Sequence, residues 1–174
     1  MAKTVSHSDM DFIDDNVFHI EQSEAYNRLS KNGIKSVEFV RAKDDCLLFV
    51  EAKRTLPNPN NPADGNLEKF ETQISEICEK FSHSLNIYSS IGIGASSESF
   101  PTDFAPSRKV SVRFVLVIKN HKPEWCRHIK QKIEATLPPY LSAIWKPKIL
   151  VINHTIATKY NLAVINPPPG NPLK

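Results

Sequence analysis

The distribution of prolines is the feature that most constrains what this chain can fold into. Its 174 residues include 13 prolines against only 5 glycines, and no proline occurs before Pro57. Twelve of the 13 fall within residues 57–62, 101–106, 138–147 and 167–172, and Pro123 stands alone. Because proline interrupts helices and strand ladders alike, these clusters divide the chain into blocks of regular structure. We predict one domain over residues 1–165 and an extended proline-rich tail over 166–174.

Hydrophobic spacing assigns a structure to each block. After a polar lead, the pattern predicts a helix at 21–31, a hairpin of strands at 34–43 and 46–55, and a helix at 67–85. A long surface loop at 89–109 follows, then a strand at 110–119, a helix at 123–137 and a strand at 148–153. Such interleaving of strands and helices predicts an α/β sandwich around a mixed sheet. Trp125 and Trp145 stand beside apolar residues and are predicted in the core.

Composition excludes several classes of protein. The 22 basic and 19 acidic residues nearly balance, so a nucleic-acid partner must be met by locally placed basic groups. Three cysteines without a CxxC pair indicate free thiols in a reducing compartment. No apolar run reaches the roughly 18 residues of a membrane span, and no phosphate-loop or dinucleotide motif is present. We therefore expect a cytoplasmic protein without a membrane segment, nucleotide cofactor or zinc site.

Charged residues interrupt both strands of the predicted hairpin. Glu38 lies in the first strand, and Glu51 and Lys53 lie in the second, where alternation puts them on one face. If Asp44 and Asp45 form a two-residue turn, paired residue numbers sum to 89. Glu38 then falls directly opposite Glu51.

Two carboxylates facing each other across a ladder require compensation. A shared proton, the neighbouring Lys53 or a divalent cation could supply it, and oxygen ligands at this separation suit Mg²⁺ or Mn²⁺. The alternative is a solvated charge cluster, in which Glu51 and Lys53 form an exposed ion pair.

The segment Glu51-Ala52-Lys53 resembles the ExK element of the PD-(D/E)xK nuclease superfamily. Glu38, with twelve residues between it and Glu51, has the spacing of the family's preceding acidic residue. The order of predicted elements is also similar to the family's restriction-endonuclease-like αβββαβ sandwich. The resemblance implies Mg²⁺ or Mn²⁺ held by Glu38 and Glu51, with Lys53 beside the scissile phosphate.

The resemblance also implies helpers on the flanking helices. Glu21 would add an acidic group to the metal site, with Glu24 as the competing choice, and Gln73 would be a polar helper on the helix after the hairpin. Nearby basic residues could form a track for the phosphates of nucleic acid. These are Lys53, Arg54, Lys69, Arg108 and Lys109.

The leading hypothesis is a metal-dependent nuclease that hydrolyses phosphodiester bonds of DNA, or of RNA, by attack of activated water. Its catalytic residues would be Glu38, Glu51, Lys53 and Gln73. The alternative is a catalytically inactive module of the same fold that binds nucleic acid or a protein partner. A single sequence leaves the formation of a homodimer open.

Overall fold

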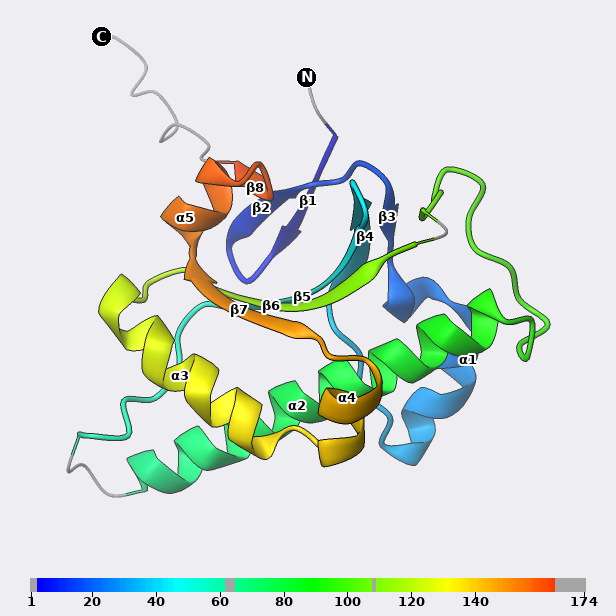
Figure 1. Ribbon diagram of the computed structural model, residues 1–174. Coiled ribbons are helices and arrows are strands. Elements are labelled where there is room, and N and C mark those ends of the chain that lie inside the picture. The colour runs from blue at the N-terminus through cyan, green and yellow to red at the C-terminus, as the bar shows by residue number, and fades with distance from the viewer. Residues whose placement is uncertain (1–2, 62–64, 108, 165–174) are drawn as a thin grey trace, which may run out of the picture.

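A five-stranded mixed sheet forms the centre of the protein, which is described over residues 3–61, 65–107 and 109–164 in a computed structural model (Figure 1). The strand order is β3-β4-β5-β6-β7. Neighbours from β3 to β5 run antiparallel, whereas β5, β6 and β7 run parallel. The strands are β3 (Val17–Phe18), β4 (Phe39–Lys43), β5 (Cys46–Lys53), β6 (Ser111–Ile118) and β7 (Lys148–Asn153). The predicted α/β class with a mixed sheet is confirmed.

The β4–β5 hairpin has the predicted register. Lys43 pairs with Cys46 and Phe39 pairs with Val50, so paired numbers sum to 89. Asp44 supplies the left-handed backbone that a two-residue turn needs, with φ of 50°. The first strand is shorter than predicted, because it begins at Phe39 and not at residue 34.

One long helix, α2 (Asn66–Gly92), covers one face of the sheet. Its buried side chains include Phe70, Ile74, Ile77 and Phe81, at the predicted spacing of three and four. The helix continues about two turns beyond the predicted end. The reason is that Ile87 and Ile91 extend the apolar face through a stretch that the sequence analysis assigned partly to a loop.

The remaining helices complete this layer. α3 (Pro123–Thr136) agrees with its prediction and packs beside α2 (Figure 1), whereas α4 (Pro139–Ile144) was not predicted. The predicted helix at 21–31 is broken into η1 (Ile20–Gln22), α1 (Glu24–Leu29) and η2 (Ser30–Asn32), because Ser23 caps α1 instead of continuing η1. The prediction that Trp125 and Trp145 are core residues is wrong: they are 43% and 41% exposed.

A second, three-stranded sheet lies on the other face of the central sheet, where Figure 1 shows it above β4 to β7. It consists of β1 (Thr4–His7), β2 (Met10–Ile13) and β8 (Ala163–Val164), with α5 (His154–Lys159) beside it. The N-terminal segment that contains β1 and β2 was expected to be polar, so these two strands were not predicted, and neither was β8. Met10 and Phe12 nevertheless alternate inward and join Phe39 and Val50 in a second buried cluster.

The cysteines, the expected absence of a membrane span and the C-terminal tail complete the comparison with the sequence. The three cysteines are free. Within the described residues, no helix is long and apolar enough to cross a membrane. The proposed tail at 166–174 lies outside the described residues.

Candidate active site

Glu38 directly precedes β4, and Glu51 lies near the end of the neighbouring strand β5, at the same end of the hairpin. The backbone N–H of Glu38 donates to the carbonyl of Val50 at 3.0 Å, which extends the ladder beyond Phe39. The Glu51 side chain is fully buried, whereas that of Glu38 is 18% exposed. The structure therefore brings together the two carboxylates that the register predicts as a pair.

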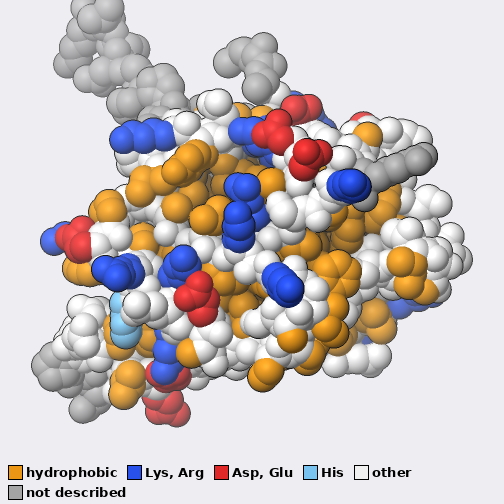
Figure 2. Space-filling view, in the orientation of Figure 1, with side chains coloured by type: hydrophobic (Ala, Val, Ile, Leu, Met, Phe, Trp, Pro, Cys, Tyr) orange, Lys and Arg blue, Asp and Glu red, His pale blue; other side chains and the backbone are white. Residues whose placement is uncertain are grey.

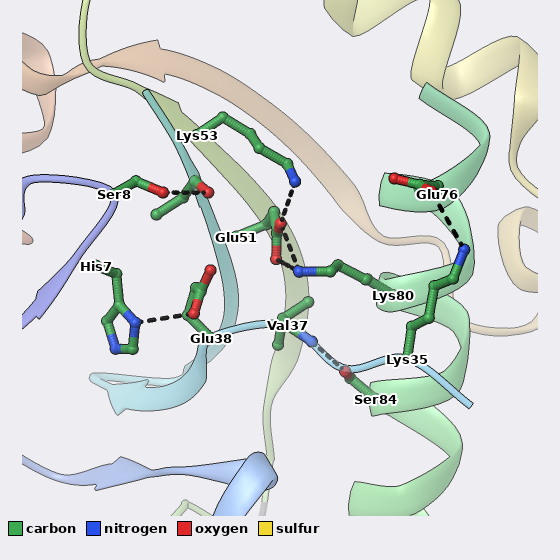
Figure 3. A network of polar contacts seen from close by, with 11 residues as sticks. His7, Ser8, Lys35, Val37, Glu38, Glu51, Lys53, Glu76, Lys80 and Ser84 are labelled. Atoms are coloured by element: carbon green, nitrogen blue, oxygen red, sulfur yellow. Dashed lines mark hydrogen bonds and ion pairs between the residues drawn. The ribbon is translucent and has the colours of Figure 1, made fainter. Parts of the chain in front are cut away.

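Two lysines approach the buried carboxylate of Glu51 (Figure 3). The Lys80 Nζ, on α2, lies 2.8 Å from Oε1 and 3.0 Å from Oε2. The Lys53 Nζ lies 3.3 Å from Oε1, and its side chain is 27% exposed. Compensation for the buried charge thus comes mainly from Lys80, while Lys53 offers its ammonium to solvent.

Burial and charge act against each other in this group. Burial raises the pKa of Glu51 despite the opposing hydrogen bonds and charge of Lys80, and the charge of Glu38 raises it further. Burial alone would lower the pKa of Lys80, but the charge and hydrogen bonds of Glu51 outweigh it and raise that pKa. Lys80 is therefore held in its charged form between carboxylates.

Glu38 has a different partner, His7 at the end of β1. The His7 Nδ1 lies 2.8 Å from Oε2 of Glu38. Burial alone would raise the pKa of Glu38, but the hydrogen bond and charge of His7, together with the charges of Lys80 and Lys53, lower it. The carboxylate of Glu38 is therefore stabilised in its ionised form.

The turn between β1 and β2 lies over the end of β5. The Ser8 Oγ donates to the carbonyl of Ala52 at 3.0 Å, and an Asp9 carboxylate oxygen lies 3.3 Å from Nε of Arg54. His7, Ser8 and Asp9 thus each contact the hairpin that carries the glutamates, and Figure 3 shows the first two beside it. The second sheet positions this edge of the site.

The two predicted helper residues differ in their placement. Glu21 is exposed on η1, and its charge is among those that raise the pKa of Lys80, so it lies within electrostatic reach of the site. Gln73 is half-buried on α2, two turns before Lys80, and takes no part in the contacts around Glu51. The structure therefore brings Glu21 toward the site more clearly than Gln73.

The predicted phosphate track does not form one continuous surface. In the parallel pairing of β5 with β6, Lys53 meets Ile118 and Cys46 meets Ser111, so Lys109 lies at the opposite end of the sheet from Lys53. Lys69 is exposed on α2, eleven residues before Lys80, or roughly 16 Å along the helix axis. Arg108 lies outside the described residues. Lys53 and Arg54 remain beside the site.

The oxygen donors of the site match the needs of a divalent cation that keeps part of its water shell. Mg²⁺ is commonly bound by one or two carboxylates, with waters and substrate phosphate completing its shell. Glu38 and Glu51 supply that number of hard oxygen ligands. Among residues 3–61, 65–107 and 109–164, no group of three or more His, Cys, Asp or Glu side chains could form a cage. The residues fit a two-carboxylate site, in which Lys80 would share Glu51 with the ion.

Sequence reasoning missed Lys80 and His7. Lys80 follows Gln73 by seven residues and therefore shares its face of the helix, the face predicted to turn toward the hairpin. A buried Glu51 with a neighbouring carboxylate needs a second cation, so this position could have been found. His7 lies in an N-terminal segment without a long hydrophobic pattern. Its contact with Glu38 depends on the second sheet, which the sequence did not predict.

Comparison of the chain with models of known protein families, with curated proteins and with solved structures found no match.

Proposed function

We propose that the protein is a metal-dependent nuclease with a restriction-endonuclease-like core. The observation that carries this proposal is the pair Glu38, directly before β4, and Glu51 on β5, with Lys53 and Lys80 against the buried carboxylate of Glu51. Paired carboxylates beside a partly exposed lysine are suited to phosphodiester hydrolysis. The order α1, β4, β5, α2 and β6 agrees with the family's helix, antiparallel strands, helix and further strand, but only two strands lie between α1 and α2 where the predicted αβββαβ order has three, because β3 precedes α1.

Each residue has a role that follows from its surroundings. A Mg²⁺ or Mn²⁺ ion held by Glu38 and Glu51 would supply positive charge to the phosphate and lower the pKa of a water. Lys53, which reaches solvent, would donate to a phosphate oxygen and stabilise the charge that develops there. Lys80 would fix the carboxylate of Glu51. Arg54 would contact the nucleic-acid backbone from the same strand end.

A cleavage assay tests the proposal. The purified protein is incubated with single- and double-stranded DNA and with RNA, linear and circular where available, in Mg²⁺ or Mn²⁺. We expect cleavage of DNA above RNA that is abolished by EDTA and reduced at least ~100-fold by Lys53→Met. Lys130→Met, on the exposed side of α3, is the matched control and should cleave like wild type.

Metal binding provides a second, independent test of the proposed function. In calorimetry with Mn²⁺, Glu51→Gln should bind the ion much more weakly than wild type. The proposal is overturned if no nucleic acid is cleaved with either metal and Mn²⁺ binding is the same in both proteins.

One observation favours a second candidate, an inactive module of the same fold. Lys80 contacts both oxygens of Glu51, and Lys53 contacts one of them, so the buried charge is already compensated. Such a module would bind nucleic acid or a protein partner without cleaving it. Nucleic-acid binding that persists unchanged in Glu51→Gln, in the absence of any cleavage, would favour this candidate.

A further inference from the structure

The outer face of the central sheet is only partly covered by the second sheet. Where that cover ends, toward the Asp44-Asp45 turn, a groove of about 660 Å³ lies between the sheet, α5 and the segment that leads to β8. This groove is separate from the candidate active site, because alternate residues of β5 point to opposite faces and Glu51 faces α2. Its apolar lining consists of Leu48, Val115, Leu150, Ile152, Ile156 and Leu162.

A row of basic side chains crosses this apolar face. The strand register pairs Arg41 with Leu48, Leu48 with Arg113, and Arg113 with Lys148. Three of the four residues in this transverse row are therefore cationic, on strands that lie about 4.8 Å apart. The space-filling view shows Lys and Arg side chains surrounded by hydrophobic ones on the face turned to the viewer (Figure 2).

The cations of the groove differ in how they are paired. Arg41 donates to the backbone carbonyls of Asp15 and Asn161, at 3.2 and 2.7 Å, and Lys43 donates to that of Tyr160 at 3.1 Å. The Nε of Arg113 is buried and has no hydrogen-bond partner among the described residues. A buried guanidinium N–H without an acceptor is costly, and Arg113 also lines the groove, so an anion in the groove would compensate the guanidinium charge.

From this arrangement we infer that the groove binds a small amphipathic anion, an apolar chain that ends in a carboxylate. The carboxylate would accept hydrogen bonds from the guanidinium of Arg113, with Lys148 adding charge from the next strand. The chain would lie on Leu48, Leu150 and Ile152. The inference does not depend on the proposed nuclease function.

Calorimetry with decanoate, below its micelle concentration, tests the inference on the full chain. We expect saturable binding by wild type and about tenfold weaker binding by Arg113→Met, which keeps the length and apolar stem of the side chain. Lys130→Met, on the other side of the sheet, is the matched control and should bind like wild type. Methyl decanoate, which lacks the charge, should bind wild type about tenfold more weakly than decanoate does.

A second variant keeps the test decisive if Arg113→Met does not fold. Leu150→Glu places a like charge in the lining at a side chain that is already 36% exposed, and it should also weaken decanoate binding about tenfold. The inference is overturned if wild type does not bind decanoate, if Arg113→Met or Leu150→Glu folds and binds it as tightly as wild type, or if methyl decanoate binds as tightly as decanoate.

Discussion

Lys80 allows a fully buried carboxylate to exist inside this fold. Lys80→Met would leave Glu51 without the partner that contacts both its oxygens, and breaking a buried pair in this way commonly costs about 3–5 kcal/mol. We therefore expect a loss of this size in the free energy of unfolding, measured by urea denaturation at pH 7.

Two comparisons isolate the cause of that loss. Lys130→Met removes an exposed ion pair with Glu134 on α3 and should change stability by less than ~1 kcal/mol. The double variant Lys80→Met with Glu51→Gln removes both charges and should be more stable than Lys80→Met alone. If Lys80→Met were as stable as Lys130→Met, the contact would have no structural role.

Glu38 should make stability depend on pH in the acidic range. Its pKa in the folded protein lies below its usual value, because His7 and the lysines outweigh burial. A carboxyl of this kind contributes stability above its unfolded pKa, and that contribution is lost as the pH falls through the folded pKa. Wild type should therefore exceed Glu38→Gln in stability at roughly pH 5, and the difference should shrink toward pH 3. Urea midpoints across this range measure it; a difference that grows as the pH falls would contradict the assignment.

At the scale of elements, α2 holds the chain that enters β4. The buried Oγ of Ser84 accepts a hydrogen bond from the backbone N–H of Val37 at 2.8 Å, one residue before Glu38 (Figure 3). Ser84→Ala leaves that N–H unpaired and should destabilise the protein by about 1–3 kcal/mol in urea unfolding. Ser75→Ala, at an exposed position of the same helix, should have little effect. Equal effects of the two changes would mean that the contact does not hold the strand entry.

The same contact explains part of what the sequence could and could not predict. A two-residue acidic turn fixes register, so the pairing of β4 with β5 followed from local residues alone. The strand begins only at Phe39 because the backbone N–H of Val37 is hydrogen-bonded to Ser84, and this contact depends on a helix nearly 50 residues away. Local patterns also gave α3 and β7 but not β1, β2 and β8, which are short and require one another.

The same distinction between local and long-range contacts applies to the candidate site. Glu38, Glu51 and Lys53 lie on one hairpin, where alternation and register determine which side chains share a face. Lys80 and His7 reach those residues from α2 and from the second sheet. Their contacts come from packing between layers, which periodicity within one strand does not encode.

At the scale of the whole molecule, two hydrophobic clusters lie on opposite faces of one sheet and should unfold together. Phe12 is fully buried in the outer cluster, with its ring centroid 5.4 Å from that of Phe39. Phe12→Ala should cost about 3–5 kcal/mol. The loss of stability should appear in the fluorescence of Trp125, in α3, and Trp145, directly after α4, on the other face, as well as in circular dichroism. A fluorescence midpoint unchanged from wild type would show that the second sheet unfolds independently.

The pairing of β2 with β8 has a consequence for how the protein is made. Phe12 and Ala163 are partners about 150 residues apart, so a ribosome releases the β1–β2 hairpin long before it releases the strand that completes the small sheet. Until then the hairpin has an unpaired edge and an uncovered apolar face, which makes a nascent chain prone to association. The end of β1, from which His7 contacts Glu38, should therefore be set in place late, and the candidate site should be among the last regions to mature during synthesis.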